Sequence, residues 1–392
     1  MEIVDLHCYQ VAVGRVYRHM ATDREGARQP SDVWRMASNY ILYELETDAG
    51  LKAIGEISDF RDSIRQLDPV QLRQLFLGAL SGIDLLQRRR AWQAVREALP
   101  ATMQPEFRQL VSASVDIALL DLAGKHFGAP VYELLGGRVR DAVPVSWVSY
   151  MRPAELLEEE IEEKLREGYR EFKLKAGDIE VDLERARIFR RVAGDEVFLR
   201  IDASGLWEEE EAIDHINRLA ELGVQAVETP IAAASRIKGM DHPEEVGESA
   251  AEALARVRRA VPVPLIEHVG DFPDAFALAL VKHRAVDVFN VIPVQTGSLH
   301  RAQRLIHLAE QAGIEVMLGS TVELGAGLAA SVHLGLASPA VSVPSDLVSP
   351  GFLVDDVVTP KFKCEAGFLS VTQAPGLGVE LDRQKLEQYR TE

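Results

Sequence analysis

The sequence predicts an α/β protein: a (β/α)8 barrel of the TIM type with an N-terminal α+β capping domain. From about residue 136 onward, eight short runs rich in β-branched residues alternate with amphipathic helical patterns. Before that point, short alternating runs come first and helical periodicity follows. A length of 392 residues also exceeds one ordinary core and suits a barrel with a companion domain.

The N-terminal part has the pattern of a sheet covered by helices. In the first 60 residues an Asp48-Ala49-Gly50 turn joins two strand-like segments. From about 68 to 136, apolar residues recur at three- and four-residue steps, as in helices. We therefore expect a capping domain over 1–135. The tail 361–392 has a strand-like and then a helical pattern, and we expect it to complete this domain.

The eight repeats favour a closed parallel barrel over residues 136–360, because crossover helices must cover a parallel sheet from outside. The connection after the fourth strand, around 234–250, is unusually long, and it fits a lid and a surface excursion equally well. The expected strands are 143–150, 171–177, 197–204, 225–231, 263–269, 286–292, 314–320 and 341–347.

Composition narrows the class of partner. A formal net charge of −18 disfavours nucleic acid and acidic lipid, which need a basic surface. The chain has no run of eighteen apolar residues, and its first ten residues lack a signal-peptide pattern, so we expect a cytoplasmic protein with no membrane partner. The two cysteines, Cys8 and Cys364, indicate neither a disulfide framework nor a zinc site.

Ionisable residues gather at the expected strand ends, where a barrel of this kind carries its active site. The lysines of the second strand are two residues apart, so both point to one face. The carboxylates of successive strands would repel one another unless a cation lies between them. The residues are Lys173, Lys175, Asp202, Glu228, Glu267 and His268.

The carboxylates taken singly are ordinary strand-end residues, but together they indicate a metal site. Oxygen ligands with room for water suit Mg²⁺ better than zinc. We choose Asp202, Glu228 and Glu267 as ligands, and His268 is the alternative to Glu267. Such a site suits removal of a proton next to a substrate carboxylate, where the metal stabilises the developing charge and a lysine is the base.

Several segments carry a family resemblance. They are VDIALLDLAGKHFGAPVYELLGG (115–137), AIGEI with Glu56, FKLKAG, RIDAS, VETP, and LGSTVELGAGLAA with Glu323. Over nearly its whole length the chain resembles the mandelate racemase and muconate-lactonizing group of the enolase superfamily. The resemblance implies that Lys175 is the base, that Lys173 supports it or contacts the carboxylate, and that Asp202 and Glu228 bind Mg²⁺. It also implies a small carboxylate substrate and a homo-oligomer.

Two departures from the family pattern bear on the reaction. The fifth strand reads Leu265-Ile266-Glu267-His268 instead of the usual acidic pair. The sixth strand has Ile292 where the family carries a lysine or aspartate, and the seventh has no histidine. A one-lysine reaction, dehydration of a hydroxy acid or sugar acid, is therefore our main prediction. An isomerase (cycloisomerase, racemase or epimerase) is the alternative, and a metal-binding pseudoenzyme is a third.

Substrate contacts are weakly encoded. Residues 13–30 and 56–60 are the expected specificity loops, in which Arg18, with Arg15 and His19, would meet a second anionic group. Asn290 and Glu323 are the other substrate-binding candidates. A rival interpretation is dinucleotide binding, because Gly325-Ala326-Gly327-Leu328-Ala329-Ala330 fits GxGxxA and Asp346 follows at a suitable distance.

Overall fold

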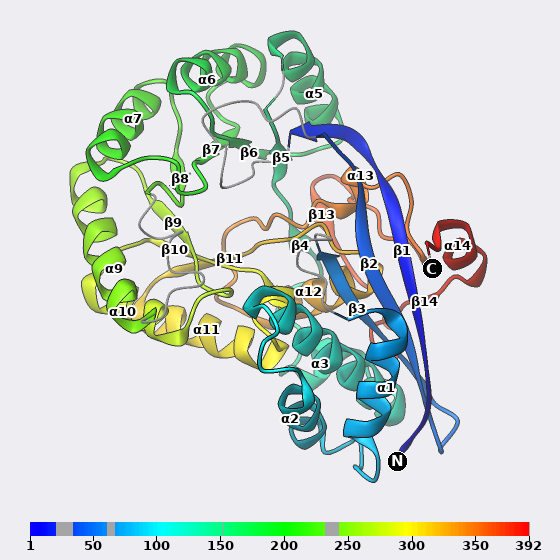
Figure 1. The fold of residues 1–392 in the computed structure, drawn as a ribbon. Coiled ribbons are helices and arrows are strands. Elements are labelled where there is room, and N and C mark those ends of the chain that lie inside the picture. The colour runs from blue at the N-terminus through cyan, green and yellow to red at the C-terminus, as the bar shows by residue number, and fades with distance from the viewer. Residues whose placement is uncertain (21–33, 61–66, 152, 232–242, 392) are drawn as a thin grey trace.

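The structure is a computed structural model, and it describes residues 1–20, 34–60, 67–151, 153–231 and 243–391. Its ribbon has two parts: a ring of alternating strands and helices, and a three-stranded sheet with helices beside it (Figure 1). Parts of the predicted specificity loop 13–30 and of the long connection 234–250 lie outside the described residues. None of the described helices combines the length and apolar character that a membrane span needs.

The N-terminal sheet is antiparallel, in the order β1-β2-β3. Its strands are β1 (Ile3–Met20), β2 (Trp34–Thr47) and β3 (Lys52–Phe60). The predicted turn joins β2 to β3: the Gly50 amide donates to the Thr47 carbonyl, and Gly50 has φ of +75°, a value that favours glycine. The predicted hairpin is therefore present.

Helices cover this sheet on one side. α1 (Pro69–Leu80) packs against β1 and begins with a capping box between Asp68 and Gln71, followed by α2 (Arg88–Ala98). The long α3 (Pro105–Phe127) is followed by the short α4 (Val131–Leu134). α3 is buried nearly all round, because it packs on β3 and also contacts three barrel elements, η1 (Pro293–Gln295), α11 (Leu299–Ala312) and α12 (Gly325–Ala337).

Two buried acids on α3 bind the neighbouring parts of the molecule. Asp116 accepts a hydrogen bond at 2.8 Å from the Leu299 amide, at the start of a barrel helix. Asp121 accepts from the Ile54 amide of β3 at 3.0 Å and from the Leu377 amide of the tail at 2.8 Å. A single helix therefore joins the sheet, the barrel and the tail.

The barrel is a parallel sheet in the order β5 to β11, with the helices outside (Figure 1). Each predicted strand from the second to the seventh is present, although the observed strands are shorter. The strands are β5 (Trp147–Ser149), β6 (Glu171–Lys175), β7 (Phe198–Asp202), β8 (Ala226–Glu228), β9 (Leu265–His268), β10 (Val288–Val291) and β11 (Glu315–Leu318). The helices are α5 (Ala154–Arg166), α6 (Ile179–Ala193), α7 (Glu209–Glu221), α9 (Pro243–Ala260), α10 (Asp274–His283), η1 (Pro293–Gln295), α11 (Leu299–Ala312) and α12 (Gly325–Ala337).

The eighth predicted strand, 341–347, closes the ring without forming a regular strand. Single parallel bridges join Val341 to Val316 of β11 and Ser345 to Val145 beside β5. Pro344 lies between these bridges and has no amide hydrogen to donate, which interrupts the ladder. The first predicted strand is also divided: β4 (Val143–Pro144) pairs with the tail, and β5 joins the barrel.

The tail returns to the N-terminal sheet. After α13 (Ser349–Phe352) come β12 (Val358–Thr359), β13 (Phe368–Leu369), β14 (Glu380–Leu381) and α14 (Arg383–Tyr389). α14 lies beside β1 in Figure 1, and Arg383 pairs with Glu44 at 2.6 Å. These contacts support the expected role of the tail, while the domain limits at 135 and 360 stay a prediction.

A glycine pair tests the packing of α3 against the tail. A Cβ added at Gly124 would lie 2.6 Å from Gly376 Cα and 2.7 Å from the Ala129 carbonyl oxygen, both of them backbone atoms. Gly124→Ala should therefore lower the free energy of urea-induced unfolding by about 1–3 kcal/mol. Gly78, exposed in α1 with no atom within 4 Å of its added Cβ, is the control. Gly78→Ala should raise stability by up to about 1 kcal/mol, and equal effects would contradict the packing.

His333 of α12 gives a pH-dependent prediction. Its ring accepts from the Tyr132 amide at 3.2 Å and lies 3.1 Å from the Leu377 carbonyl oxygen. Burial lowers the pKa of His333 to about 4. The unfolded chain, with a pKa of about 6.5, then binds more protons than the folded one, so His333 destabilises the protein as pH falls through this window. Between pH 6.5 and 4, the free energy of unfolding of His333→Gln should fall less than that of wild type. Parallel curves of this free energy against pH for the two proteins would contradict the prediction.

Candidate active site

Side chains at the C-terminal ends of the barrel strands form one cluster on the face toward the barrel interior. The register pairs Lys175 with Asp202 and Asp202 with Glu228. It also pairs His268 with Asn290. Alternation along each strand therefore turns these side chains the same way. Below them the interior is filled by a small apolar cluster of Ala226, Ile266, Val288 and Met317.

Lys173 is the centre of the cluster. Its Nζ lies 2.8 Å from Asp202 Oδ2, 2.8 Å from Glu228 Oε1 and 3.0 Å from Asp346 Oδ2. Burial alone would lower the pKa of Lys173, but the carboxylates of Asp202, Asp346 and Glu228 outweigh it and raise that pKa. Lys173 is therefore a fixed ammonium and not a base.

Lys175 lies nearer the mouth and is partly exposed, with 17% of its side chain accessible. Its Nζ is 2.5 Å from Asp202 Oδ2, while the amide of Ser204 donates to the other oxygen, Oδ1, at 2.7 Å. Burial would raise the pKa of Asp202, but Lys173 and Lys175 lower it well below its usual value. The carboxylate of Asp202 is thus firmly ionised.

Glu228 is fully buried and has two further neighbours. His268 Nε2 lies 2.8 Å from Glu228 Oε1, and Asn290 Nδ2 donates to the same oxygen at 3.0 Å. Burial and Asp202 act to raise the pKa of Glu228, but Lys173 and His268 lower it to about 2. Its second oxygen, Oε2, has no hydrogen-bond partner within the described part of the chain, and Arg200 Nε lies 3.9 Å from it.

Two residues of the cluster were missed by the sequence reasoning. Arg200 is buried on β7 and pairs with Asp346, whose Oδ1 also accepts from Ser146 Oγ at 2.6 Å. The sequence assigns Asp346 a place only in the rival dinucleotide interpretation. Arg200 could have been found by strand alternation, which turns Arg200 and Asp202 to the same face.

The structure does not bring Glu267 to this cluster, and it brings His268 instead. Ligand atoms of Asp202, Glu228 and His268 all lie within 4.8 Å of one another. Glu267 pairs in register with Phe289 and points to the other face of β9, where its Oε1 accepts from Thr229 Oγ1 at 3.0 Å. A shift of one residue along a strand reverses the face, so His268 faces the cluster and Glu267 does not.

Of the predicted substrate-binding residues, some lie in the cluster and others do not. Asn290 lies in the cluster, whereas no described contact links Glu323 to it: Glu323 is buried in the loop before α12 and accepts from the Thr321 amide at 2.8 Å. The side chains of Arg18 and His19 lie outside the described part of the structure. Arg15 pairs with Asp59 at 2.9 Å, so its charge is already matched.

The dinucleotide interpretation is wrong. The N-terminus of α12, where a phosphate would lie, is occupied by the buried carboxylate of Glu56 from β3. Glu56 accepts from the Leu324 amide at 2.8 Å and from the Gly327 amide at 2.7 Å. Glu56, in one of the segments that carry the family resemblance, therefore joins the N-terminal sheet to the barrel.

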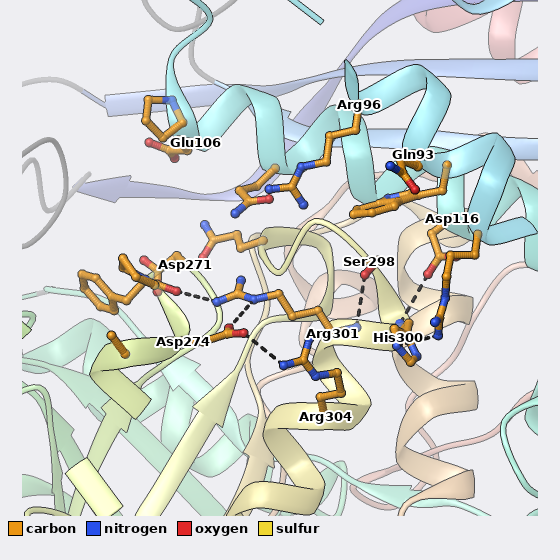
Figure 2. A pocket seen from close by; sticks show the side chains of 18 of the residues that line it. Gln93, Arg96, Glu106, Asp116, Asp271, Asp274, Ser298, His300, Arg301 and Arg304 are labelled. Carbon is orange, nitrogen blue, oxygen red and sulfur yellow. Dashed lines mark hydrogen bonds and ion pairs between the residues drawn. The ribbon is translucent and has the colours of Figure 1, made fainter. Parts of the chain in front are cut away.

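A cavity of about 1100 Å³ lies between α2 and α3 of the N-terminal part and the segments around Asp274 and Arg301. Figure 2 shows Arg301 and Arg304 turned toward Asp274, with Arg96 of α2 opposite. The predicted catalytic and metal-binding residues are not among its lining residues. The strand-end cluster is the better candidate for the chemistry, because it holds charged groups at contact distance around an unpartnered buried oxygen.

Comparisons with known proteins show the family of the chain. Residues 156–385 match the enolase C-terminal domain-like family model. Residues 25–136 match the mandelate racemase / muconate lactonizing enzyme N-terminal domain model. The muconate lactonizing enzyme from Pseudomonas fluorescens complexed with muconolactone shares 25% identity and a TM-score of 0.84, and the alignment covers 100% of this chain and 99% of that one.

Two curated relatives match the chain over about 70% of their own length. Muconate cycloisomerase 1-1 of Acinetobacter lwoffii is 32% identical over 289 residues, which cover 72% of this chain and 71% of the relative. L-Ala-D/L-Glu epimerase of Clostridium acetobutylicum is 32% identical over 271 residues, covering 68% and 71%. Both names describe isomerases, so the comparisons favour the isomerase alternative over dehydration. The chain belongs to the mandelate racemase and muconate-lactonizing group of the enolase superfamily, a group of enzymes.

Proposed function

We propose that the protein is a divalent-metal-dependent isomerase that transfers a proton at the carbon next to a substrate carboxylate, on one face only. The observation that carries the proposal is the position of Lys175 at the mouth with apolar Ile292 across from it. β6 and β10 are four places apart in a ring of eight, so the two side chains come from opposite sides. Ile292 is buried and has no proton to give or take.

The charges of the cluster support a metal at this place. The carboxylates of Asp202, Glu228 and Asp346 balance the side chains of Lys173, Lys175 and Arg200, three against three. A bound dication would add two positive charges, which favours a neutral amine on Lys175 and attracts an anionic substrate. Loss of one proton from Lys175 and binding of a substrate with one negative charge would together offset the two charges of the dication.

The donors present also fit a metal. Asp202, Glu228 and His268 would hold it, and the unpartnered Oε2 of Glu228 offers a free lone pair. When bound, the cation would stabilise the negative charge that develops on the substrate carboxylate, with Mg²⁺ the ion predicted from the carboxylates. Lys173, held as an ammonium by three carboxylates, would orient the substrate carboxylate from the barrel side.

The reaction can be written with one lysine. Lys175 Nζ takes the proton from the carbon next to the carboxylate, and an enediolate forms. The bond from the neighbouring carbon to oxygen then breaks, its electron pair leaves with the oxygen, and a C=C bond forms. If that oxygen belongs to a carboxylate of the same molecule, as in a lactone, ring opening gives an isomer, and ring closure with proton return is the reverse.

Dehydration is the second candidate, and the same observation favours it. A hydroxyl on the neighbouring carbon would leave as water with the proton that Lys175 removed. Racemisation and epimerisation, in contrast, need a proton donor on the opposite face, where Ile292 lies. A small carboxylate substrate, a homo-oligomer and a cytoplasmic location remain predictions.

The first test is a screen of lactones, unsaturated diacids, hydroxy acids and acylated amino acids in deuterated water with MgCl₂. We expect isomerisation with deuterium at one carbon, and Lys175→Ala should lower the rate by about 10²–10⁴-fold. Exposed Lys282, paired with Glu248 outside the cluster, supplies the control Lys282→Ala, which should behave as wild type.

Three outcomes are informative. Loss of water would replace isomerisation by dehydration. Activity that survives Lys175→Ala would contradict the one-lysine mechanism. Metal binding without deuterium exchange in any substrate would favour a pseudoenzyme.

A second prediction concerns Asp346. Asp346→Asn would leave Lys173 and Arg200 buried with one fewer carboxylate, and we expect the free energy of unfolding to fall by about 3–5 kcal/mol. Glu209→Gln, which breaks an exposed ion pair with Arg256, is the control and should change stability by about 0.5 kcal/mol or less. Urea titrations compare the variants. Equal effects would show that Asp346 is not the counter-charge described here.

A further inference from the structure

Among the three side chains of the cluster that could hold a metal, His268 offers a nitrogen. Glu228 and Ile266 are register partners, and His268 follows Ile266 by two residues, so His268 returns to the interior face. Its Nε2 is 2.8 Å from Glu228 Oε1. Glu267, between them, faces outward and accepts from Thr229 Oγ1 and from the His268 amide, each at 3.0 Å.

A second observation points to a ligand at this place. Glu228 is fully buried, and its Oε2 has no hydrogen-bond partner among the described residues. Oδ1 of Asn290, also buried, is likewise unpartnered within the described ranges. Buried oxygens are seldom left without a partner, because the loss of hydration costs about 1–3 kcal/mol each. A cation and its water molecules would satisfy both atoms.

The donor set has a chemical consequence. Mg²⁺ prefers an all-oxygen shell, whereas imidazole nitrogen is a good ligand for first-row transition metals. Affinity at a mixed site rises from Mn²⁺ to Co²⁺, in the general order for these ions. Asp202 and Glu228 alone would not discriminate strongly, so the histidine decides the preference.

We infer that His268, and not Glu267, is the third ligand, and that this site binds Mn²⁺ and Co²⁺ more tightly than Mg²⁺. The inference rests on the proposed function only in taking the cluster as a metal site. It concerns the identity of the ion and predicts that Mg²⁺ binds more weakly than Mn²⁺ and Co²⁺, even if Mg²⁺ supports turnover.

The experiment uses the full chain without substrate. Isothermal titration with MnCl₂, CoCl₂ and MgCl₂ gives the three affinities, and pulsed EPR of the Mn²⁺ protein detects coupling to a ligand nitrogen. Growth with ¹⁵N-histidine should change that coupling. We expect Mn²⁺ to bind at least about tenfold more tightly than Mg²⁺, a difference of about 1.4 kcal/mol.

Two variants separate the candidates. His268→Asp gives three carboxylates and should lower the ratio of Mn²⁺ to Mg²⁺ affinity by about tenfold or more, and abolish the nitrogen coupling. Glu267→Gln is the matched neighbour and should leave both readouts unchanged, with circular dichroism reporting whether each variant is folded. The wild-type EPR spectrum decides the matter even if a variant fails to fold.

The inference is overturned if wild-type Mn²⁺ protein shows no histidine nitrogen coupling, if Mg²⁺ binds as tightly as Mn²⁺, or if no ion binds because Lys173 already neutralises the carboxylates. The titrations and the EPR measurement use no substrate, so a screen that finds no proton exchange would not contradict the assignment of His268. In the same way, a lack of nitrogen coupling would not contradict the one-lysine reaction.

Discussion

The balance of buried charge inside the barrel mouth is the constraint on which the rest of the site depends. Three carboxylates and three cations lie within contact of one another, all of them buried except the partly exposed Lys175, and removal of a buried member would leave an uncompensated buried charge. This requirement explains why Arg200 is buried and why the irregular segment 341–347 must close the ring: it supplies Asp346. In the proposed function, a dication would change a balance that is otherwise even, and this change would favour a neutral amine on Lys175.

Buried acids join the N-terminal part of the chain to the barrel. Glu56 of β3 caps the N-terminus of α12, Asp116 of α3 accepts from the first amide of α11, and Asp121 joins α3 to β3 and the tail. Each acid satisfies backbone amides that would otherwise be buried without partners. The two parts of the chain are therefore coupled through hydrogen bonds at helix ends, next to the loops that follow the barrel strands.

Much of this arrangement could be predicted from the sequence. The 2- and 3.6-residue periods gave the hairpin, the covering helices and most barrel strands, and strand alternation placed Lys173, Lys175, Asp202 and Glu228 together. Pro344 was a visible reason to doubt a regular eighth strand. Alternation also separates Glu267 from His268, once the register with Asn290 is known.

Other features depend on long-range contacts that no local pattern carries. The pairing of Lys173 with Asp346 joins residues 173 positions apart, and the cap that Glu56 provides joins residues about 270 apart. The preference for dehydration over isomerisation was an inference from Ile292 and from the lack of a histidine in the seventh strand. These two features argue against a second base, but they do not choose between two reactions that each need one lysine.

The most direct test of the account is a crystal structure grown with Mn²⁺, with anomalous diffraction used to locate the ion. The account predicts one peak between Asp202, Glu228 and His268, with Lys173 Nζ still paired to Asp346 and Lys175 Nζ free of Asp202. A peak coordinated by Glu267, or carboxylates still occupied only by the two lysines, would contradict it.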